Sequence, residues 1–262
     1  MPSQIYTARM CCTPAYQIDW SYCLFWRKEP ADFAWIDELT RLNEGDGIRI
    51  LQHEFNEPSS SQFLVSTKPS VSPLLIAQRI KERLQHLMRP SHPHAFRRNY
   101  SLRSIGSTKR EKLDRYLETQ LGHHPMADVR MARRLSKYQF HDDRVDLSLR
   151  RSTSHARYWY NLHVVLVNED RYMEVRDNVL QRIHDMIVFA AQKKDHWLSR
   201  AAIVPDHIHL TMGCTVAESP EEVVLSYMNN IAYACGMKPV FRASYYVGTF
   251  REYDLGVIPR AV

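Results

Sequence analysis

Glycine is scarce in this chain, and the loops that depend on glycine are missing with it. Only 8 of the 262 residues are glycine, about 3% against a usual share of ~7%. Neither a G-x-G-x-x-G string nor a G-x-x-x-x-G-K-[ST] string occurs, and these are the loops that hold dinucleotides and nucleotide phosphates. The sequence therefore argues against a Rossmann or P-loop nucleotide site.

Long apolar runs and paired cysteines are also lacking. The longest apolar run spans residues 186–191, far short of the ~18 residues that a membrane span needs. The first 16 residues contain no apolar core of the kind found in a signal peptide. The 5 cysteines form no C-x-x-C pair, which is typical of thiols in a reducing compartment. We expect a cytoplasmic protein without disulfides, zinc knuckle or membrane contact.

The composition of the chain is that of a folded protein with an excess of basic residues. Hydrophobic residues make up 44% and charged residues 24%, as in ordinary globular domains. With 35 Lys and Arg against 29 Asp and Glu, the net charge is +6. This excess favours a polyanionic partner such as nucleic acid.

Two stretches of the chain predict the same order of elements. Alternating and β-branched runs indicate strands, and apolar residues at a 3.6-residue period indicate helices. In the first stretch the expected elements are strands at 16–26, 47–55, 62–66 and 100–105, and helices at 32–43, 73–90 and 108–122. In the second they are strands at 161–167, 201–204, 207–212 and 245–250, and helices at 175–191 and 219–235. Each stretch thus reads β-α-β-β-α-β, the ferredoxin-like order, in an α+β fold with antiparallel sheets.

A constant offset of 145 residues relates the two stretches. It aligns residues 61–65 with 206–210 and Tyr100 with Tyr245. Identity between the copies is sparse, so the prediction of an internal repeat depends on order and spacing. We expect a first half at 1–121, a basic linker at 122–157 and a second half at 158–262.

The sharpest motif is Asp206-His207-Ile208-His209-Leu210. Residues two apart on a strand point to the same face, so His207 and His209 can offer both imidazoles to one divalent metal. A bare H-x-H string is weak evidence, since two polar residues on a half-exposed strand produce it as well. His92-Pro93-His94 has the same spacing, but its proline argues against a strand.

With its surroundings, this motif resembles the core of the single-tyrosine HUH transposases, which include the REP-associated tyrosine transposases and the enzymes of small insertion sequences. Residues 160–166 resemble the opening strand of that family and residues 242–250 its last core strand. The resemblance implies a helix after the last strand that carries a nucleophilic tyrosine and, four residues later, a metal-binding glutamine. The second half departs from this pattern, because the tyrosine would fall on Ala261.

The first half contains what the second lacks. Residues 99–120 resemble the last strand and tyrosine helix of the family, with Tyr116 and Gln120 in the expected spacing, and such a pair shares a helix face. In place of the histidines the first half has Gln62 and Leu64. We therefore predict a fused pseudo-dimer with one composite site, in which Tyr116 is the nucleophile and His207, His209 and Gln120 bind the metal.

The resemblance implies a metal-dependent DNA transposase or nickase that acts on single-stranded or hairpin DNA. Mg²⁺ or Mn²⁺ would polarise the scissile phosphate, and Tyr116 would form a 5′-phosphotyrosine intermediate. As a fused tandem, the chain is expected to be a monomer.

Basic residues near the predicted nucleophile are candidates for DNA phosphate contacts. They are Arg97, Arg98, Arg103, Lys109, Arg110, Lys112 and Arg115. A solvated charged helix and loop explain each residue alone better, and they explain the whole cluster equally well. The aromatic rings of Phe96, Tyr100, Tyr245 and Tyr246 have the chemistry to stack on bases, although we expect them in the core or the sheet.

Three alternatives remain open from the sequence. The chain is a non-catalytic DNA-hairpin binder or regulator that kept the fold and lost the reaction, or it is a structural or RNA-binding protein, since a ferredoxin-like fold does not fix function. In a third alternative the nucleophile is Tyr245, Tyr246 or Tyr253.

Overall fold

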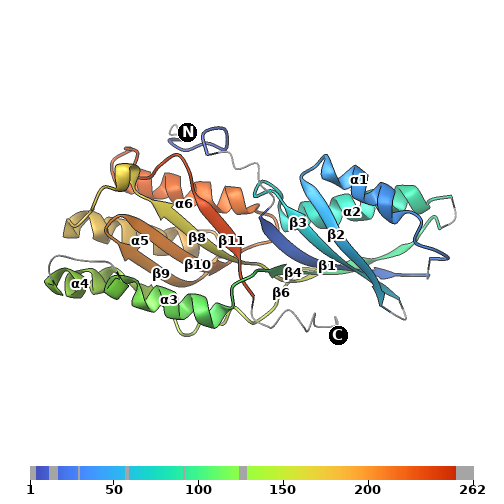
Figure 1. The fold of residues 1–262 in the computed structure, drawn as a ribbon, viewed down its shortest axis with the longest axis horizontal. Coiled ribbons are helices and arrows are strands. Elements are labelled where there is room, and N and C mark those ends of the chain that lie inside the picture. Colours follow the sequence, from blue (N-terminus) through green and yellow to red (C-terminus); the bar gives the residue numbers. More distant parts are fainter. Residues whose placement is uncertain are drawn as a thin grey trace.

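The computed structural model describes residues 4–11, 17–28, 30–56, 59–90, 92–123 and 129–251. Within these residues the chain forms a mixed α+β fold with two largely antiparallel sheets that lie side by side (Figure 1). Among the helices of the described ranges, none has both the length and the apolar character needed to cross a bilayer.

The first sheet is built from the first predicted stretch. In chain order its elements are β1 (Ile18–Trp26), α1 (Ile36–Glu44), β2 (Ile48–Asn56), β3 (Ser60–Thr67), α2 (Pro73–Met88) and β4 (Phe96–Ile105). Their strands lie in the spatial order β2-β3-β1-β4. The side chain of Ser72 accepts a hydrogen bond from the Leu75 N–H at 3.2 Å and Pro73 follows it, so α2 begins where the sequence predicts.

The second sheet repeats this arrangement. Its elements are β8 (Asn161–Val167), the short 3-10 turn η2 (Glu169–Arg171), α5 (Asp177–Lys193), β9 (Trp197–Val204), β10 (His207–Gly213), α6 (Pro220–Ala234) and β11 (Tyr246–Thr249). Read as β9-β10-β8-β11, the spatial order of its strands corresponds strand for strand to the order β2-β3-β1-β4 of the first sheet. The predicted capping box opens α6, because Ser219 and Glu222 each accept a hydrogen bond from the other residue's backbone N–H.

The segment between the two predicted halves adds strands to both sheets. It follows α3 (Arg110–His123) and contains α4 (Val129–Leu135), η1 (Ser136–Tyr138), β5 (Phe140–His141), β6 (Arg151–Ser152) and the start of β7 (Ala156–Trp159). Strand β5 pairs with β9, whereas β7 pairs parallel to β4 and β6 extends that edge. Leu135 and Leu147 are buried, so this basic segment is packed against the rest of the protein.

The two sheets meet where β4 ends beside β11. A Cβ on Gly106 would lie only 1.9 Å from the Thr249 carbonyl oxygen, so the backbones touch at a distance that only glycine permits. The Ser104 hydroxyl accepts a hydrogen bond from the Asn161 N–H at 3.0 Å. Across the same junction the rings of Trp20 and Tyr160 meet edge to face at 5.1 Å. Buried residues of both halves form one continuous hydrophobic core.

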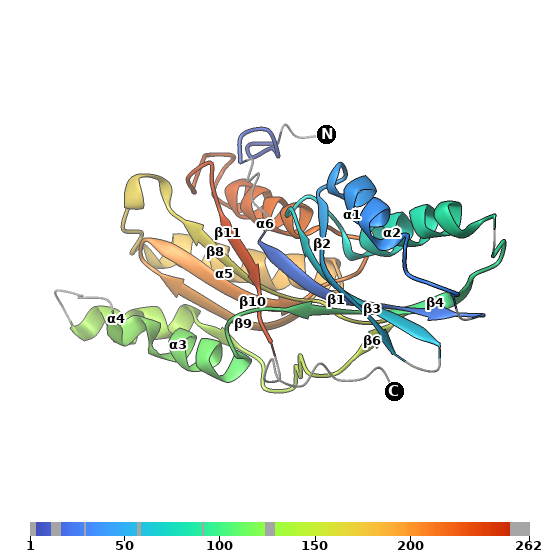
Figure 2. The same ribbon diagram turned by 45° about the vertical axis from the view of Figure 1, so that its right-hand side comes forward.

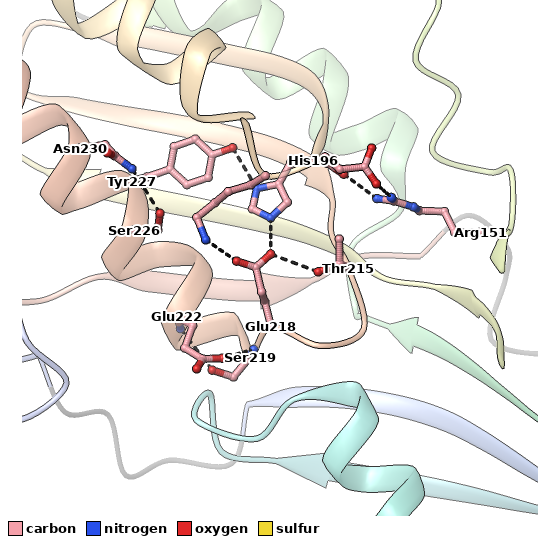
Figure 3. A network of polar contacts seen from close by, with 11 residues as sticks. Arg151, His196, Thr215, Glu218, Ser219, Glu222, Ser226, Tyr227 and Asn230 are labelled. Atoms are coloured by element: carbon pink, nitrogen blue, oxygen red, sulfur yellow. Dashed lines mark hydrogen bonds and ion pairs between the residues drawn. The ribbon is translucent and has the colours of Figure 1, made fainter. Parts of the chain in front are cut away.

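A buried polar network fixes the end of the second sheet that faces α6 (Figure 3). His196 Nε2 lies 2.8 Å from Glu218 Oε2, and His196 Nδ1 lies 3.1 Å from the Tyr227 hydroxyl. The Glu218 carboxylate also accepts hydrogen bonds from Lys194 and from the Thr215 hydroxyl. The network ties the loop before α6 to the turn after α5.

Candidate active site

The two histidines of the H-x-H motif lie side by side on β10. Their ring centroids are 4.8 Å apart with a 74° angle between the planes. In the register, His209 pairs with Val165 on β8 and with Ala202 on β9. Both histidines are buried, His209 to 4% exposure. The same-face geometry predicted from the spacing is therefore present.

The His207 ring is held by a carboxylate. Its Nδ1 lies 2.7 Å from Asp206 Oδ1, and Asp206 Oδ2 accepts a hydrogen bond from Arg171 Nη1 at 2.9 Å. Arg171 and its neighbour Asp170 have φ values of 51° and 50°, a left-handed conformation that is costly for residues other than glycine. A carboxylate on one ring nitrogen orients the imidazole so that Nε2 is the atom offered to a metal.

The His209 ring is held by a residue that the sequence reasoning did not select. His163 Nε2 lies 3.0 Å from His209 Nδ1, and the two rings stack at 5.3 Å with an 8° angle. Burial lowers the pKa of His163 to about 4, so this imidazole is neutral at neutral pH. His163 stands on β8, which neighbours β10. In the sequence it could have been found from its position within residues 160–166, the stretch that resembles the opening strand of the transposase family.

Helix α3, which carries Tyr116 and Gln120, lies against the second sheet and not against the first (Figures 1 and 2). Leu113 and Leu117 pack with Ala202 of β9 in a separate small hydrophobic cluster. Ala202 pairs with His209 in the register and so shares its face of the sheet. The helix predicted from the first half thus lies over the histidine-bearing face formed by the second half.

Tyr116 and His209 are brought into contact by this packing. Their rings meet edge to face with centroids 5.5 Å apart and an angle of 86°. The Tyr116 side chain remains 47% exposed, so the phenol is accessible from solvent beside a buried imidazole.

An ion-pair pattern holds α3 in this position. Arg200 of β9 reaches Asp114 at 3.1 Å through Nε and Glu118 at 2.9 Å through Nη1. These two carboxylates are one helical turn apart and flank Tyr116 in the sequence. The arginine side chain is only 14% exposed, so solvent and salt screen these contacts less than those of a fully exposed ion pair.

Gln120 is buried next to the site, but it bonds to its own helix. Its Nε2 donates to the Tyr116 carbonyl oxygen at 3.4 Å. The structure thus places Gln120 one turn beyond Tyr116 on α3.

The basic residues predicted to contact DNA are spread over β4, the segment before α3 and α3 itself. Lys112 and Arg115 are exposed on α3, and Arg110 on the same helix is 3.3 Å from Asp146. Lys109 precedes α3 and bridges to Arg251. Arg103 stacks over Trp159 at 4.0 Å.

The remaining two, Arg97 and Arg98, lie near the start of β4. Arg97 and Arg103 are six positions apart along the strand, roughly 20 Å. Only Lys112 and Arg115 are therefore both exposed and on the helix of Tyr116.

The first sheet has different side chains at the corresponding positions. Gln62 and Leu64 lie on β3, the third strand in chain order, as the histidines lie on β10. The Gln62 amide donates to the Ser21 hydroxyl at 2.8 Å. A shallow pocket here is lined by Ser21, Gln52, Glu54, Gln62, Phe63, Leu64 and Ile105.

The alternative tyrosines lie in different environments. The Tyr245 hydroxyl donates to Glu221 of α6 at 3.1 Å, whereas Tyr246 contacts His163 with ring centroids 5.6 Å apart. Tyr253 and Ala261 lie outside the described residues.

The imidazoles of His207 and His209 suit a divalent metal that takes two nitrogen ligands and further oxygen ligands. His207 and His209 both have Nδ1 engaged by a neighbour, which orients each Nε2 as a ligand. Over the described ranges, no group of three or more His, Cys, Asp or Glu side chains has the geometry of a metal site.

Comparison with known proteins supports the resemblance seen in the sequence. Residues 156–258 match the family model described as IS200-like transposase. The predicted resemblance to the single-tyrosine transposases is thereby confirmed for this part of the chain. No curated protein matches the chain.

Two solved structures resemble parts of the fold. One is a protein from Deinococcus radiodurans R1 described as a putative transposase, at 14% identity and a TM-score of 0.31, over 40% of this chain and 92% of that one. The other is a REP-associated tyrosine transposase bound to a REP hairpin, at 11% identity and a TM-score of 0.31, over 36% of this chain and 58% of that one.

Proposed function

We propose that this protein is a transposase or nickase of the single-tyrosine type, which cuts and rejoins single-stranded or hairpin DNA at one composite active site. The observation that carries the proposal is the edge-to-face contact of Tyr116 with His209. These residues are 93 positions apart in the numbering, and they come from the two stretches that each lack half of the motif. The family match of residues 156–258 supports the same conclusion.

The chemistry is a transesterification. The Tyr116 phenolic oxygen loses its proton and attacks the scissile phosphorus, so that a Tyr116 Oη–P bond forms and the P–O3′ bond breaks. The departing 3′ oxygen takes up a proton to become a 3′-hydroxyl, and the downstream strand is left as a 5′-phosphotyrosine. Because one phosphodiester replaces another, a 3′-hydroxyl can reverse the step and reseal a strand.

His207 and His209 are the residues that would hold a divalent cation, Mg²⁺ or Mn²⁺, with Gln120 as a third ligand after a rotation of its side chain. When bound, such a cation supplies a positive charge against the phosphate oxygens. Asp206 and His163 keep the two imidazoles in the orientation that this requires.

The two sheets support a fused pseudo-dimer as the origin of this arrangement. Each has the same strand order, yet only the second sheet presents histidines and only the first stretch supplies the tyrosine helix. One chain would therefore contain one site. Lys112 and Arg115, exposed on α3, are the basic residues best positioned to contact DNA phosphates beside Tyr116.

The experiment is a covalent-adduct assay with single-stranded DNA from the flanks of the protein's own gene, in Mn²⁺ or Mg²⁺. DNA labelled at its 3′ end leaves the label on the protein, whereas DNA labelled at its 5′ end gives a shortened strand. We expect both products with wild type, neither with Tyr116→Phe, and a large loss with His207→Ala. Tyr233→Phe is the matched control, because Tyr233 is a 61% exposed tyrosine on α6.

Three results would contradict the proposal. An adduct that survives Tyr116→Phe moves the nucleophile to another residue. A labelled protein obtained from 5′-labelled DNA reverses the polarity of the reaction. A wild type that retards the DNA on a native gel but forms no adduct with either ion is a DNA-binding protein without the reaction.

A further inference from the structure

Tyr246 is a second half-exposed tyrosine on the face that carries the histidines. It opens β11 and pairs with Val165 of β8, which places its side chain on the same face as His163 and His209. Its edge-to-face contact with His163 has an interplanar angle of 65°, and 53% of the residue is exposed. The ring is thus held at its contact with His163, and about half of the residue is exposed to solvent.

Gly248 makes room for the ring in this position. A Cβ added at Gly248 would lie 2.5 Å from Tyr246 Oη, 3.0 Å from Cζ and 3.4 Å from Cε1. The outer end of the ring therefore leans over the strand at Gly248 instead of standing upright in solvent. A glycine within a strand often marks a place where another group approaches closely, and here that group is the ring itself.

Tyr246 begins a row of four rings that ends at the predicted nucleophile. From Tyr246 to His163, from His163 to His209 and from His209 to Tyr116, the centroid distances are 5.6, 5.3 and 5.5 Å. The two imidazoles in the middle are the more buried members, and the tyrosines at the ends are about half exposed. Three ring-to-ring contacts thus connect Tyr246 with Tyr116, and they put a half-exposed aromatic ring at the same site as the proposed nucleophile.

We infer that Tyr246, positioned by Gly248 and His163, is a stacking subsite for an unpaired nucleobase close to the scissile phosphate. The inference depends on the proposed function, since it assigns the place of one base of that substrate. An aromatic face is suited to this because every base has a π surface, so the contact holds single strands of varied sequence. A paired base, which is already stacked in a duplex, would gain less from it.

The test measures binding of fluorescent single-stranded DNA by anisotropy, in the Tyr116→Phe background with Mn²⁺ so that no cleavage occurs. Tyr246→Ala is expected to weaken binding by about 5- to 150-fold, the loss of one base stack. Tyr246→Phe keeps the ring and is expected to bind within about 2-fold of the parent. Tyr233→Ala, which removes an exposed tyrosine from α6, is the matched control and is expected to have no effect.

Two further measurements separate stacking from a general loss of structure. Gly248→Ala leaves Tyr246 in the chain but pushes its ring away, so it is expected to weaken binding at least 5-fold with an unchanged circular dichroism spectrum. A scan of abasic sites along the oligonucleotide is expected to find one position at which Tyr246→Ala causes no further loss.

The outcomes distinguish this inference from the proposal on which it depends. Equal binding by Tyr246→Ala and the parent overturns the subsite while the adduct assay still decides the activity. A loss with Tyr246→Phe as large as with Tyr246→Ala assigns the effect to the hydroxyl and overturns stacking. If the parent protein binds no single-stranded DNA at all, the proposed function fails together with the subsite.

Discussion

His163 Nε2 lies 3.0 Å from His209 Nδ1, and the two stacked rings join β8 to β10. Because burial lowers the pKa of His163 to about 4, this residue is a neutral imidazole that accepts the His209 Nδ1–H when the ring of His163 carries its proton on Nδ1. That hydrogen bond selects the tautomer in which His209 Nε2 is the metal-binding atom.

Removal of His163 should therefore weaken metal binding. We expect His163→Ala to raise the dissociation constant for Mn²⁺ by about 10- to 100-fold, the usual cost of losing such a supporting contact. His163→Gln retains an acceptor oxygen and should lose less. Calorimetric titration of Mn²⁺ measures both, with His184→Ala on α5 as the control. Equal affinity in His163→Ala and wild type would show that His209 needs no support from β8.

The ion pairs of Arg200 lead to a prediction about the position of α3. Arg200→Ala removes the contacts to Asp114 and Glu118, while Leu113 and Leu117 still pack on Ala202. We expect the rate of adduct formation to fall about 10- to 100-fold, because small displacements of a reacting group are costly. The affinity for DNA should change by less than about 2-fold.

A comparison of hydrogen exchange completes this test. In Arg200→Ala the amides of α3 should exchange faster while those of β8 and β10 keep their protection. Arg144→Ala is the control, since the Arg144 side chain is 89% exposed and forms a surface ion pair with Asp142. Loss of DNA affinity in step with the rate would assign Arg200 to substrate binding instead of helix placement.

Most of the order of helices and strands could be predicted from the sequence, because it is determined by residues close together in the chain. Ser72 and Ser219 begin their helices with caps, and the spacing of His207 and His209 follows from the period of a strand. The resemblance to a known family added the pairing of Tyr116 with the histidines of the other half, which α3 then makes by lying over β9.

What the sequence did not reveal depends on contacts between distant strands. His163 is recognisable as a partner of His209 only once β8 is known to neighbour β10. Arg200 likewise looks like any strand arginine until α3 is packed against it. Even a correct spacing left open the direction of the Gln120 side chain, which is bonded to its own helix.

The close contact between the sheets leads to a prediction about stability. Gly106→Ala places a Cβ only 1.9 Å from the Thr249 carbonyl oxygen, and both partners belong to backbone that cannot move without disturbing β4 or β11. We expect a loss of about 3 kcal/mol or more in the free energy of unfolding by urea. Gly122→Ala is the control, because no atom lies within 4 Å of its Cβ and alanine favours a helix by up to about 1 kcal/mol. Equal stability of Gly106→Ala and wild type would mean that the junction is loose.

The last prediction concerns the acid stability that Glu218 provides. Burial raises the pKa of this carboxyl, but the hydrogen bonds from His196 and Lys194 outweigh burial and lower it from 4.5 to about 2. A carboxyl with a lowered pKa stabilises the folded state above its unfolded pKa and loses that effect as the pH falls. At about 1.4 kcal/mol per pKa unit, the contribution near neutral pH is at most about 3 kcal/mol.

Glu218→Gln should therefore unfold at a lower temperature than wild type at pH 7, and the difference should shrink between pH 4.5 and pH 2. Thermal unfolding followed by circular dichroism across that range measures it. A difference that stays constant from pH 7 to pH 2 would mean that Glu218 acts through packing, because a contact without charge does not depend on protonation.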